Sequence, residues 1–163
     1  MGRRFNVARL PTGTPNVQSV TYTAAQVFLK GALLVDVAAG TVSECAANPA
    51  RVFGVALEGA NTKPGGTGIA NNPSYITGGQ YKEVSVAIAD RMTVFSCRGV
   101  NGGTDPVVPL QTHIGESYGV LKSGNDWVMD QSNVTNLVVE VVDIDVDQNI
   151  FFVKFLQAVL ALP

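Results

Sequence analysis

Charged residues are scarce in this chain. Only 15% of its 163 residues are Asp, Glu, Lys or Arg, whereas about 25% is typical of globular domains. A surface with so few charges fits a protein that is partly covered by copies of itself or by a partner. The formal net charge is −2, from 11 basic and 13 acidic residues. Because there is no basic excess, we do not expect nucleic acid as a partner.

Histidine and cysteine are also rare, which excludes most catalytic and metal-binding patterns. His113 is the only histidine, and Cys45 and Cys97 are the only cysteines. We expect two buried, unpaired thiols, because a chain of this length does not need a disulfide to fold. Cys97 with His113 as its general base is the one pairing that suggests nucleophilic catalysis, and no motif of a known catalytic family surrounds either residue. We therefore predict that the chain is not an enzyme and has no cofactor.

Long apolar runs are missing too. The basic N-terminal stretch is not followed by the apolar core of a signal peptide. Residues 151–162 are apolar, but Lys154 and Gln157 interrupt them, and the run is shorter than the roughly 20 residues that cross a bilayer. We expect no membrane partner. We interpret this run as core or interface, with Val159 and Leu160 as possible subunit contacts.

Short segments rich in β-branched and aromatic residues make up most of the chain, and Gly, Pro and Asn separate them. No convincing long amphipathic helix is visible. The predicted class is all-β, a compact β-barrel or β-sandwich that occupies residues 26–163 as one domain. The predicted strands are 27–30, 32–37, 41–45, 51–58, 81–89, 92–97, 113–122, 126–129, 137–146 and 151–156. We expect 81–89 and 92–97 to form a hairpin, and residues 59–80 to form a long loop.

Residues 1–25 are predicted to be an extended N-terminal arm. Pro11, Gly13 and Pro15 punctuate a polar stretch, and proline disfavours both a helix and a central strand. Arg3, Arg4 and Arg9 make its beginning basic, with no acidic residue among the first ten positions.

An acidic row lies near the other end of the chain. Asp143, Asp145 and Asp147 alternate with aliphatic residues, so on a strand they share one face. Three interpretations are open: a solvated face, a docking face for a basic partner or another subunit, and part of a site for a hard cation such as calcium. The spacing of ~7 Å between alternate residues is wide for one ion. Because Val139 and Val141 precede the acids on the same face, we expect a bulge or an exit from the core.

Two further features have simple structural interpretations. Trp127 and Tyr118 are expected in the core rather than on a sugar-binding platform. Asn133-Val134-Thr135 matches a glycosylation sequon, which we expect to be unused.

One region resembles a known family. It comprises Lys30-Gly31-Ala32-Leu33-Leu34-Val35, then Thr41-Val42-Ser43, then residues 50–60 with the sequence ARVFGVALEGA. Residues 26–60 thereby resemble the capsid decoration (cement) proteins of tailed bacteriophages, in which a G-D-L-V pattern is followed by G-V-A. Ala32 departs from this pattern, because an acidic residue is frequent at that position in the family.

The resemblance implies a structural protein with a β-tulip-like domain. Such proteins bind the outer surface of the expanded capsid, commonly as trimers, and brace neighbouring major capsid subunits. It further implies assembly in the bacterial cytoplasm and a final location on the virion exterior. Here the arm would contact the capsid through Arg3, Arg4, Phe5, Arg9 and Leu10. Alternative interpretations are another phage structural subunit, of the tail, baseplate or fibre, and a carbohydrate-binding β module.

Overall fold

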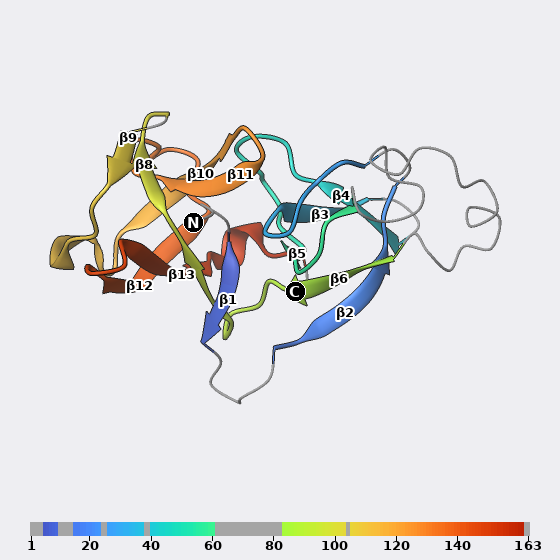
Figure 1. Ribbon diagram of the computed structural model, residues 1–163. Helices are drawn as coiled ribbons and strands as arrows, with labels where there is room; N and C mark the ends of the chain where they lie inside the picture. The colour runs from blue at the N-terminus through green and yellow to red at the C-terminus, as the bar shows by residue number, and fades with distance from the viewer. Residues whose placement is uncertain are drawn as a thin grey trace.

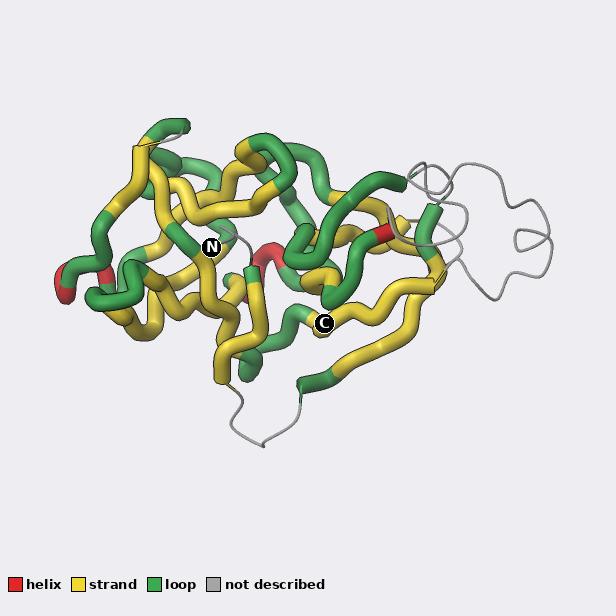
Figure 2. The backbone as a smooth tube through the Cα atoms, in the orientation of Figure 1, coloured by secondary structure: helices red, strands yellow, loops and turns green. Residues whose placement is uncertain are grey.

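Strands dominate the computed structural model, which describes residues 5–9, 15–23, 26–37, 40–60, 83–103 and 105–161. They form an eight-stranded and a five-stranded sheet, side by side in Figure 1. Within the described ranges, helix occurs only as short turns, such as the 3-10 turns Gln111–His113 and Gln157–Val159 (Figure 2). The predicted all-β class is confirmed. Of the two predicted architectures, the sheets resemble a sandwich and do not form a closed barrel.

The eight-stranded sheet comes mainly from the second half of the chain. Its order is β1-β7-β13-β12-β10-β11-β8-β9. The bounds are β1 Asn6–Arg9, β7 Val94–Cys97, β8 Gly99–Asn101, β9 Asp105–Val107, β10 Ser117–Ser123, β11 Asp126–Asp130, β12 Val139–Asp145 and β13 Ile150–Phe155. The pair β8–β11 is parallel and the other pairs are antiparallel.

The five-stranded sheet has the order β2-β6-β5-β3-β4, and all its neighbours are antiparallel. The bounds are β2 Val17–Thr21, β3 Leu33–Val37, β4 Thr41–Glu44, β5 Gly54–Ala56 and β6 Glu83–Ile88. Its edge strands β2 and β4 approach each other at one parallel bridge, Tyr22–Val42. The sheet is therefore curved so that its two edge strands meet at this bridge, but they are not paired along their whole length.

The N-terminal segment takes part in both sheets. β1 pairs with β7 in the larger sheet, and β2 pairs with β6 in the smaller one. Residues 5–9 and 15–23 therefore run antiparallel to the β6–β7 segment and connect the two sheets. The expected arm is corrected for these described residues: they are strands of the domain, because pairing with β6 and β7 satisfies their main-chain groups.

The hairpin expected between β6 and β7 is wrong. The two strands belong to different sheets. Between them, Asp90 Oδ1 accepts hydrogen bonds from the main-chain N–H groups of Met92 (2.8 Å) and Thr93 (2.6 Å). This Asx turn redirects the chain from one sheet to the other, whereas a two-residue hairpin would have kept both strands in one sheet.

Further strand assignments differ from the sequence prediction. Residues 27–30 are not a strand, because the chain turns there: the Ala32 N–H bonds to Leu29 O at 3.1 Å, and Gly31 has φ +86°. Conversely, β9 contains Pro106, although no predicted strand includes residues 105–107. Proline is tolerated there because β9 is an edge strand and needs hydrogen-bond donors on one side only.

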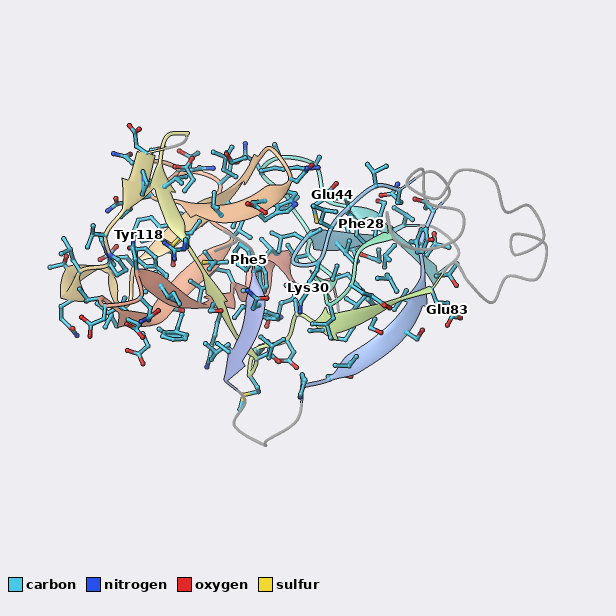
Figure 3. All side chains as sticks on the ribbon, viewed as in Figure 1. Phe5, Phe28, Lys30, Glu44, Glu83 and Tyr118 are labelled. Atoms are coloured by element: carbon cyan, nitrogen blue, oxygen red, sulfur yellow. The ribbon has the colours of Figure 1, made fainter. Side chains whose placement is uncertain are left out.

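Both sheets contribute to one hydrophobic core. Its fully buried aromatic side chains include Phe5, Tyr22, Phe95, Trp127 and Phe151. Two of these five come from the N-terminal segment, which is therefore part of the folded body. Figure 3 shows Phe5 pointing inward where the two sheets meet.

Candidate functional site

The first predicted contact residue lies inside the fold. Phe5 is only 1% exposed and stacks on Phe155, with ring centroids 5.9 Å apart. Phe155 in turn meets the edge of the Phe95 ring at 5.2 Å. The expectation that Phe5 contacts a capsid is therefore wrong, because burying this ring in its own core removes more apolar surface from water than an exposed position would.

The remaining N-terminal contact residues are described only in part. Arg3, Arg4 and Leu10 lie outside the described residues. The backbone of Arg9 pairs with Val94 at the end of β1, after an irregularity in the register between Val7 and Arg9. The predicted loop at 59–80 also lies largely outside the described residues, which stop at Ala60 and resume at Glu83.

The C-terminal contact residues pack against their own chain. Val159 is buried, and its carbonyl accepts a hydrogen bond from the Val52 N–H at 2.6 Å. Val52 O then accepts a bond from the Ala161 N–H at 3.0 Å, and Leu160 packs partly buried against the core. Val159 is thus corrected from a subunit contact to a core residue, since its apolar side chain is covered within one copy.

The acidic row follows a bulge, which is one of the two arrangements expected from its pattern. Opposite β13, the register shifts between Val141 and Asp143, so that Val142 is an extra residue. Before the bulge Val139 and Val141 are buried, and after it Ile144 packs on the core. The bulge therefore reverses the faces of β12, which explains how two valines and three aspartates can share one alternating pattern.

The three acids do not assemble a metal site. Asp143 Oδ1 accepts the Ile144 N–H and Asp145 Oδ1 accepts the Gln148 N–H, both at 2.9 Å. Asp147 is exposed in the turn that leads to β13. Within the described part of the chain, no three His, Cys, Asp or Glu side chains are grouped so that they could hold an ion.

Both cysteines are free and buried, in agreement with the prediction. Burial raises the pKa of the Cys45 thiol from 9.0 to about 12, and the neighbouring Glu44 carboxylate adds to the rise. Burial also raises the Cys97 pKa to about 12, against a smaller opposing effect of a hydrogen bond from the Met129 main chain. Nucleophilic cysteines have a lowered pKa, so both thiols are shifted in the opposite direction.

His113 holds a loop in place. Its Nδ1 accepts a hydrogen bond from the Leu110 N–H at 3.0 Å, and its ring packs against Tyr118 and Phe151. Nε2 lies 2.8 Å from the side-chain amide of Gln131. Because Nδ1 of His113 accepts a hydrogen bond, the proton of the neutral ring is on Nε2. The Gln131 side-chain amide must then direct its oxygen toward Nε2 to accept that proton's hydrogen bond. Both nitrogens are therefore engaged by Leu110 and Gln131 rather than by Cys97.

The aromatic residues considered for sugar binding are buried. Trp127 is inaccessible, and its indole N–H bonds to Glu44 Oε1 at 3.0 Å. Tyr118 is 8% exposed, and burial raises the pKa of its hydroxyl. The prediction that both belong to the core is confirmed, and neither ring offers a face on which a sugar could stack.

The side chain of the sequon asparagine, Asn133, is hydrogen-bonded within the protein. Asn133 Nδ2 donates to Asn48 Oδ1 at 2.7 Å, and its Oδ1 accepts the Asn136 N–H at 3.0 Å. Its side chain also covers Gly119, where an added Cβ would collide with the Asn133 side chain. An amide held in this way cannot receive a glycan without breaking local structure.

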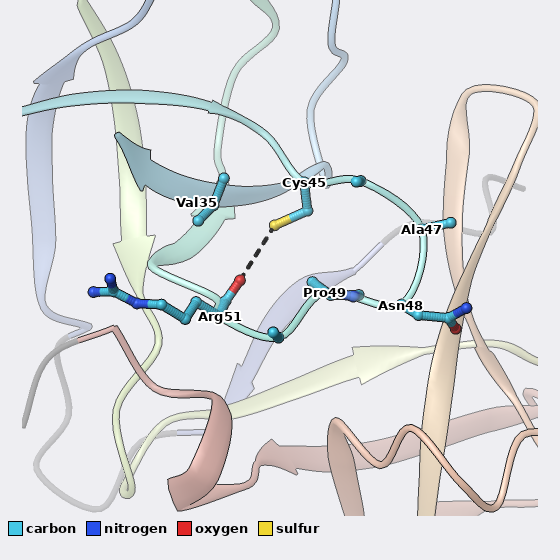
Figure 4. Close-up of a pocket in the computed structure, with 8 residues that line it drawn as sticks. Val35, Cys45, Ala47, Asn48, Pro49 and Arg51 are labelled. Carbon is cyan, nitrogen blue, oxygen red and sulfur yellow. Dashed lines mark hydrogen bonds between the residues drawn. The ribbon is translucent and has the colours of Figure 1, made fainter. Parts of the chain in front are cut away.

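An apolar pocket of about 310 Å³ lies inside the loop after β4 (Figure 4). It is lined by Val35, Cys45, Ala46, Ala47, Asn48, Pro49, Ala50 and Arg51. The loop is closed by Asn48, with φ +53°, and by a weak bond from Cys45 Sγ to Arg51 O at 3.7 Å. Such small apolar residues can receive an aliphatic group, but they bring together no reactive group.

A second hollow opens where β2 and β4 diverge, and its volume is about 370 Å³. It is lined by Gln18, Ser19, Val20, Thr21, Asp36, Gly40, Thr41, Val42 and Phe53. Asp36 Oδ2 pairs with Arg51 Nη2 at 3.1 Å, whereas Asp36 Oδ1 is buried without a partner. Sequence patterns gave no sign of this cleft, because it depends on which two strands become edges.

Comparison with protein-family models, with curated proteins and with solved structures finds no match. Among the described residues, no helix combines the length and apolar character that crossing a membrane requires.

Proposed function

We propose that this chain is a capsid decoration protein of a tailed bacteriophage. It binds the outer surface of the expanded shell, associates with its own copies as a trimer and braces neighbouring major capsid subunits. It is assembled in the bacterial cytoplasm and remains on the virion exterior. Such a task requires a rigid body with contact surfaces.

The observation that carries this proposal is the structural role of the resembling segment. Its three parts coincide with β3, β4 and the β5 region, which are neighbours in the five-stranded sheet. The glycine of its GVAL sequence, Gly54, lies where an added Cβ would collide with Ala87 O and approach Val86 Cγ1 to 2.6 Å. Close packing of β5 against β6 therefore requires glycine at position 54. This requirement supports the use of the GVAL sequence as a signature of this fold.

The surface is a second source of support. Val108 and Leu110 flank a buried proline and are 57% and 55% exposed, and Val134 is 66% exposed. With only 15% charged residues in the chain, these side chains suit coverage by a shell or by another copy.

Co-sedimentation with purified, empty, expanded shells of the source phage tests the proposal. The wild-type chain should pellet saturably, whereas the charge-reversed variant Arg3→Glu, Arg4→Glu should bind less and depend less on salt. The control is Lys30→Glu, which reverses a charge at an exposed position in the turn before β3.

Deleting residues 1–25 is unsuitable as a binding test, because Phe5 and Tyr22 belong to the core. Circular dichroism and thermal unfolding of each variant must match the wild type before binding is compared. If the folded wild-type chain stays in the supernatant at shell concentrations up to saturation of the assay, the decoration role is wrong.

A further inference from the structure

Strand β2 lies at the edge of the five-stranded sheet, next to β6. Ser85, on the neighbouring strand β6, turns its main-chain groups toward β5: its N–H bonds to Glu58 Oε1 at 2.8 Å, and its carbonyl accepts the Leu57 N–H at 2.9 Å. Ser19 lies opposite Ser85 in the register. Ser19 and Ser85 therefore form a non-hydrogen-bonded pair, in which the main-chain N–H and C=O groups of the two residues point away from each other. The N–H and C=O of Ser19 therefore point out of the sheet.

These groups face the cleft between β2 and β4. Ser19 is one of the residues that line it, together with its neighbours on β2. No hydrogen bond within the described residues occupies the Ser19 main-chain N–H or C=O. The strands approach at Tyr22–Val42, where the Thr23 N–H bonds to Val42 O at 2.9 Å, and they diverge toward the start of β2. The cleft thus leaves room beside a sheet edge with unused hydrogen-bonding capacity.

The cleft also contains a carboxylate oxygen that accepts no hydrogen bond in the described structure. Asp36 shares a face with Val42 on the neighbouring strand, and its Oδ1 is buried with no partner in the described structure. A buried carboxylate oxygen without a donor is costly, so a ligand that supplies one is favoured. A cationic side chain would add charge complementarity, because Arg51 balances the carboxylate only from its other oxygen.

We propose that an extended segment of the shell protein adds as a strand to β2 in this cleft and directs a Lys or Arg side chain toward Asp36 Oδ1. The inference rests on the proposed decoration function and specifies how the shell is held. Main-chain pairing at Ser19 supplies affinity that is independent of sequence, and Asp36 selects a basic residue. Val17, 45% exposed at the start of β2, adds an apolar contact for the incoming strand.

Two substitutions of one residue separate main-chain pairing from side-chain effects. Ser19→Pro removes the outward N–H and places a ring in the cleft, while the pairing of β2 with β6 stays intact because that N–H points away from β6. Ser19→Ala keeps the N–H. Both variants lose the hydroxyl bond to Glu83 Oε2 at 2.7 Å, so this loss cancels in the comparison.

Binding to expanded shells is then measured by co-sedimentation for the wild type and for Ser19→Ala, Ser19→Pro and Asp36→Asn. We expect Ser19→Ala to bind like the wild type, Ser19→Pro to bind at least about tenfold more weakly, and Asp36→Asn to bind a few-fold more weakly with reduced salt dependence. Thermal unfolding must show that all four are folded.

The outcomes distinguish the two proposals. If the wild type and Ser19→Pro pellet equally, strand addition is overturned and the decoration function stands. If the folded wild type does not pellet, both are overturned. If Ser19→Pro changes the oligomeric state in sedimentation velocity without shells, the edge serves self-association, and the shell segment is excluded as its occupant.

Discussion

Glu44 and Trp127 connect the two sheets. The indole N–H of Trp127, on β11, donates to Glu44 Oε1, on β4, at 3.0 Å. The other oxygen, Oε2, pairs with Lys122 Nζ at 2.6 Å, and the Glu44 main-chain N–H bonds to Gln26 Oε1 at 3.0 Å. The Glu44 side chain is only 14% exposed. One carboxylate, shielded from water, thus fixes the smaller sheet against the larger one.

Replacing Glu44 with Ala should destabilise the protein by about 1–3 kcal/mol, because a buried indole N–H is left without an acceptor. Urea unfolding measures this loss. Lys122→Ala is the matched control, and it should cost less than about 1 kcal/mol because the Lys122 side chain is 35% exposed. Equal losses for the two variants would show that the ion pair, rather than the indole bond, joins the sheets.

Phe5→Ala should cost about 3–5 kcal/mol, the range found when a buried aromatic ring is truncated. Phe5 stacks on Phe155 in the common core, so its loss opens a cavity between the N-terminal strand and β13. Val134→Ala, at a 66% exposed position, should change stability by no more than about 0.5 kcal/mol. A Phe5 variant as stable as the wild type would mean that the N-terminal strand is not part of the core.

Gly54→Ala should destabilise the smaller sheet, by about 1–3 kcal/mol as overpacking typically does. The new Cβ would meet both Val86 Cγ1 and the main-chain oxygen of Ala87. Combining it with Val86→Ala relieves only the side-chain contact, since the backbone of β6 cannot move away from its paired strands. In thermal denaturation the double variant should therefore remain less stable than Val86→Ala alone. Full recovery in the double variant would contradict the backbone clash.

The thiols make stability fall at alkaline pH. The pKa of each cysteine rises from 9.0 to about 12 on folding, so the folded state holds the proton more tightly than the unfolded state. Their contribution is fully present below pH 9 and is lost as the pH rises from 9 toward 12. Free energies of unfolding between pH 8 and 11 should decline less steeply in the Cys45→Ala, Cys97→Ala variant. Parallel profiles for the variant and the wild type would contradict the shifted values.

Much of the fold could be predicted from local sequence. Alternating apolar residues located β6, β12 and β13, and the change of pattern at Asp143 indicated either a bulge or an exit from the core, of which the structure shows the bulge. These features could be predicted because side chains alternate across a strand, so burial on one face is visible in the sequence. The burial of Cys45, Cys97 and Trp127 followed from residue type.

Other features required the tertiary structure. Proline and glycine between polar residues indicated an arm at 1–25, but Phe5 and Tyr22 are core residues, because β6 and β7 provide partners for both N-terminal strands. The turn at Asp90 looked like a hairpin locally, and its role in moving the chain between sheets depends on where each strand pairs.

The all-β class and the buried faces of most strands can be read from local sequence, because both depend on the alternation of neighbouring side chains. Which strands are edges, and therefore that Ser19 turns its main-chain groups toward a cleft beside Asp36, became visible only in the folded chain. Main-chain hydrogen bonds are the same for every residue type, so strand pairing between distant segments is set by the packing of the whole chain.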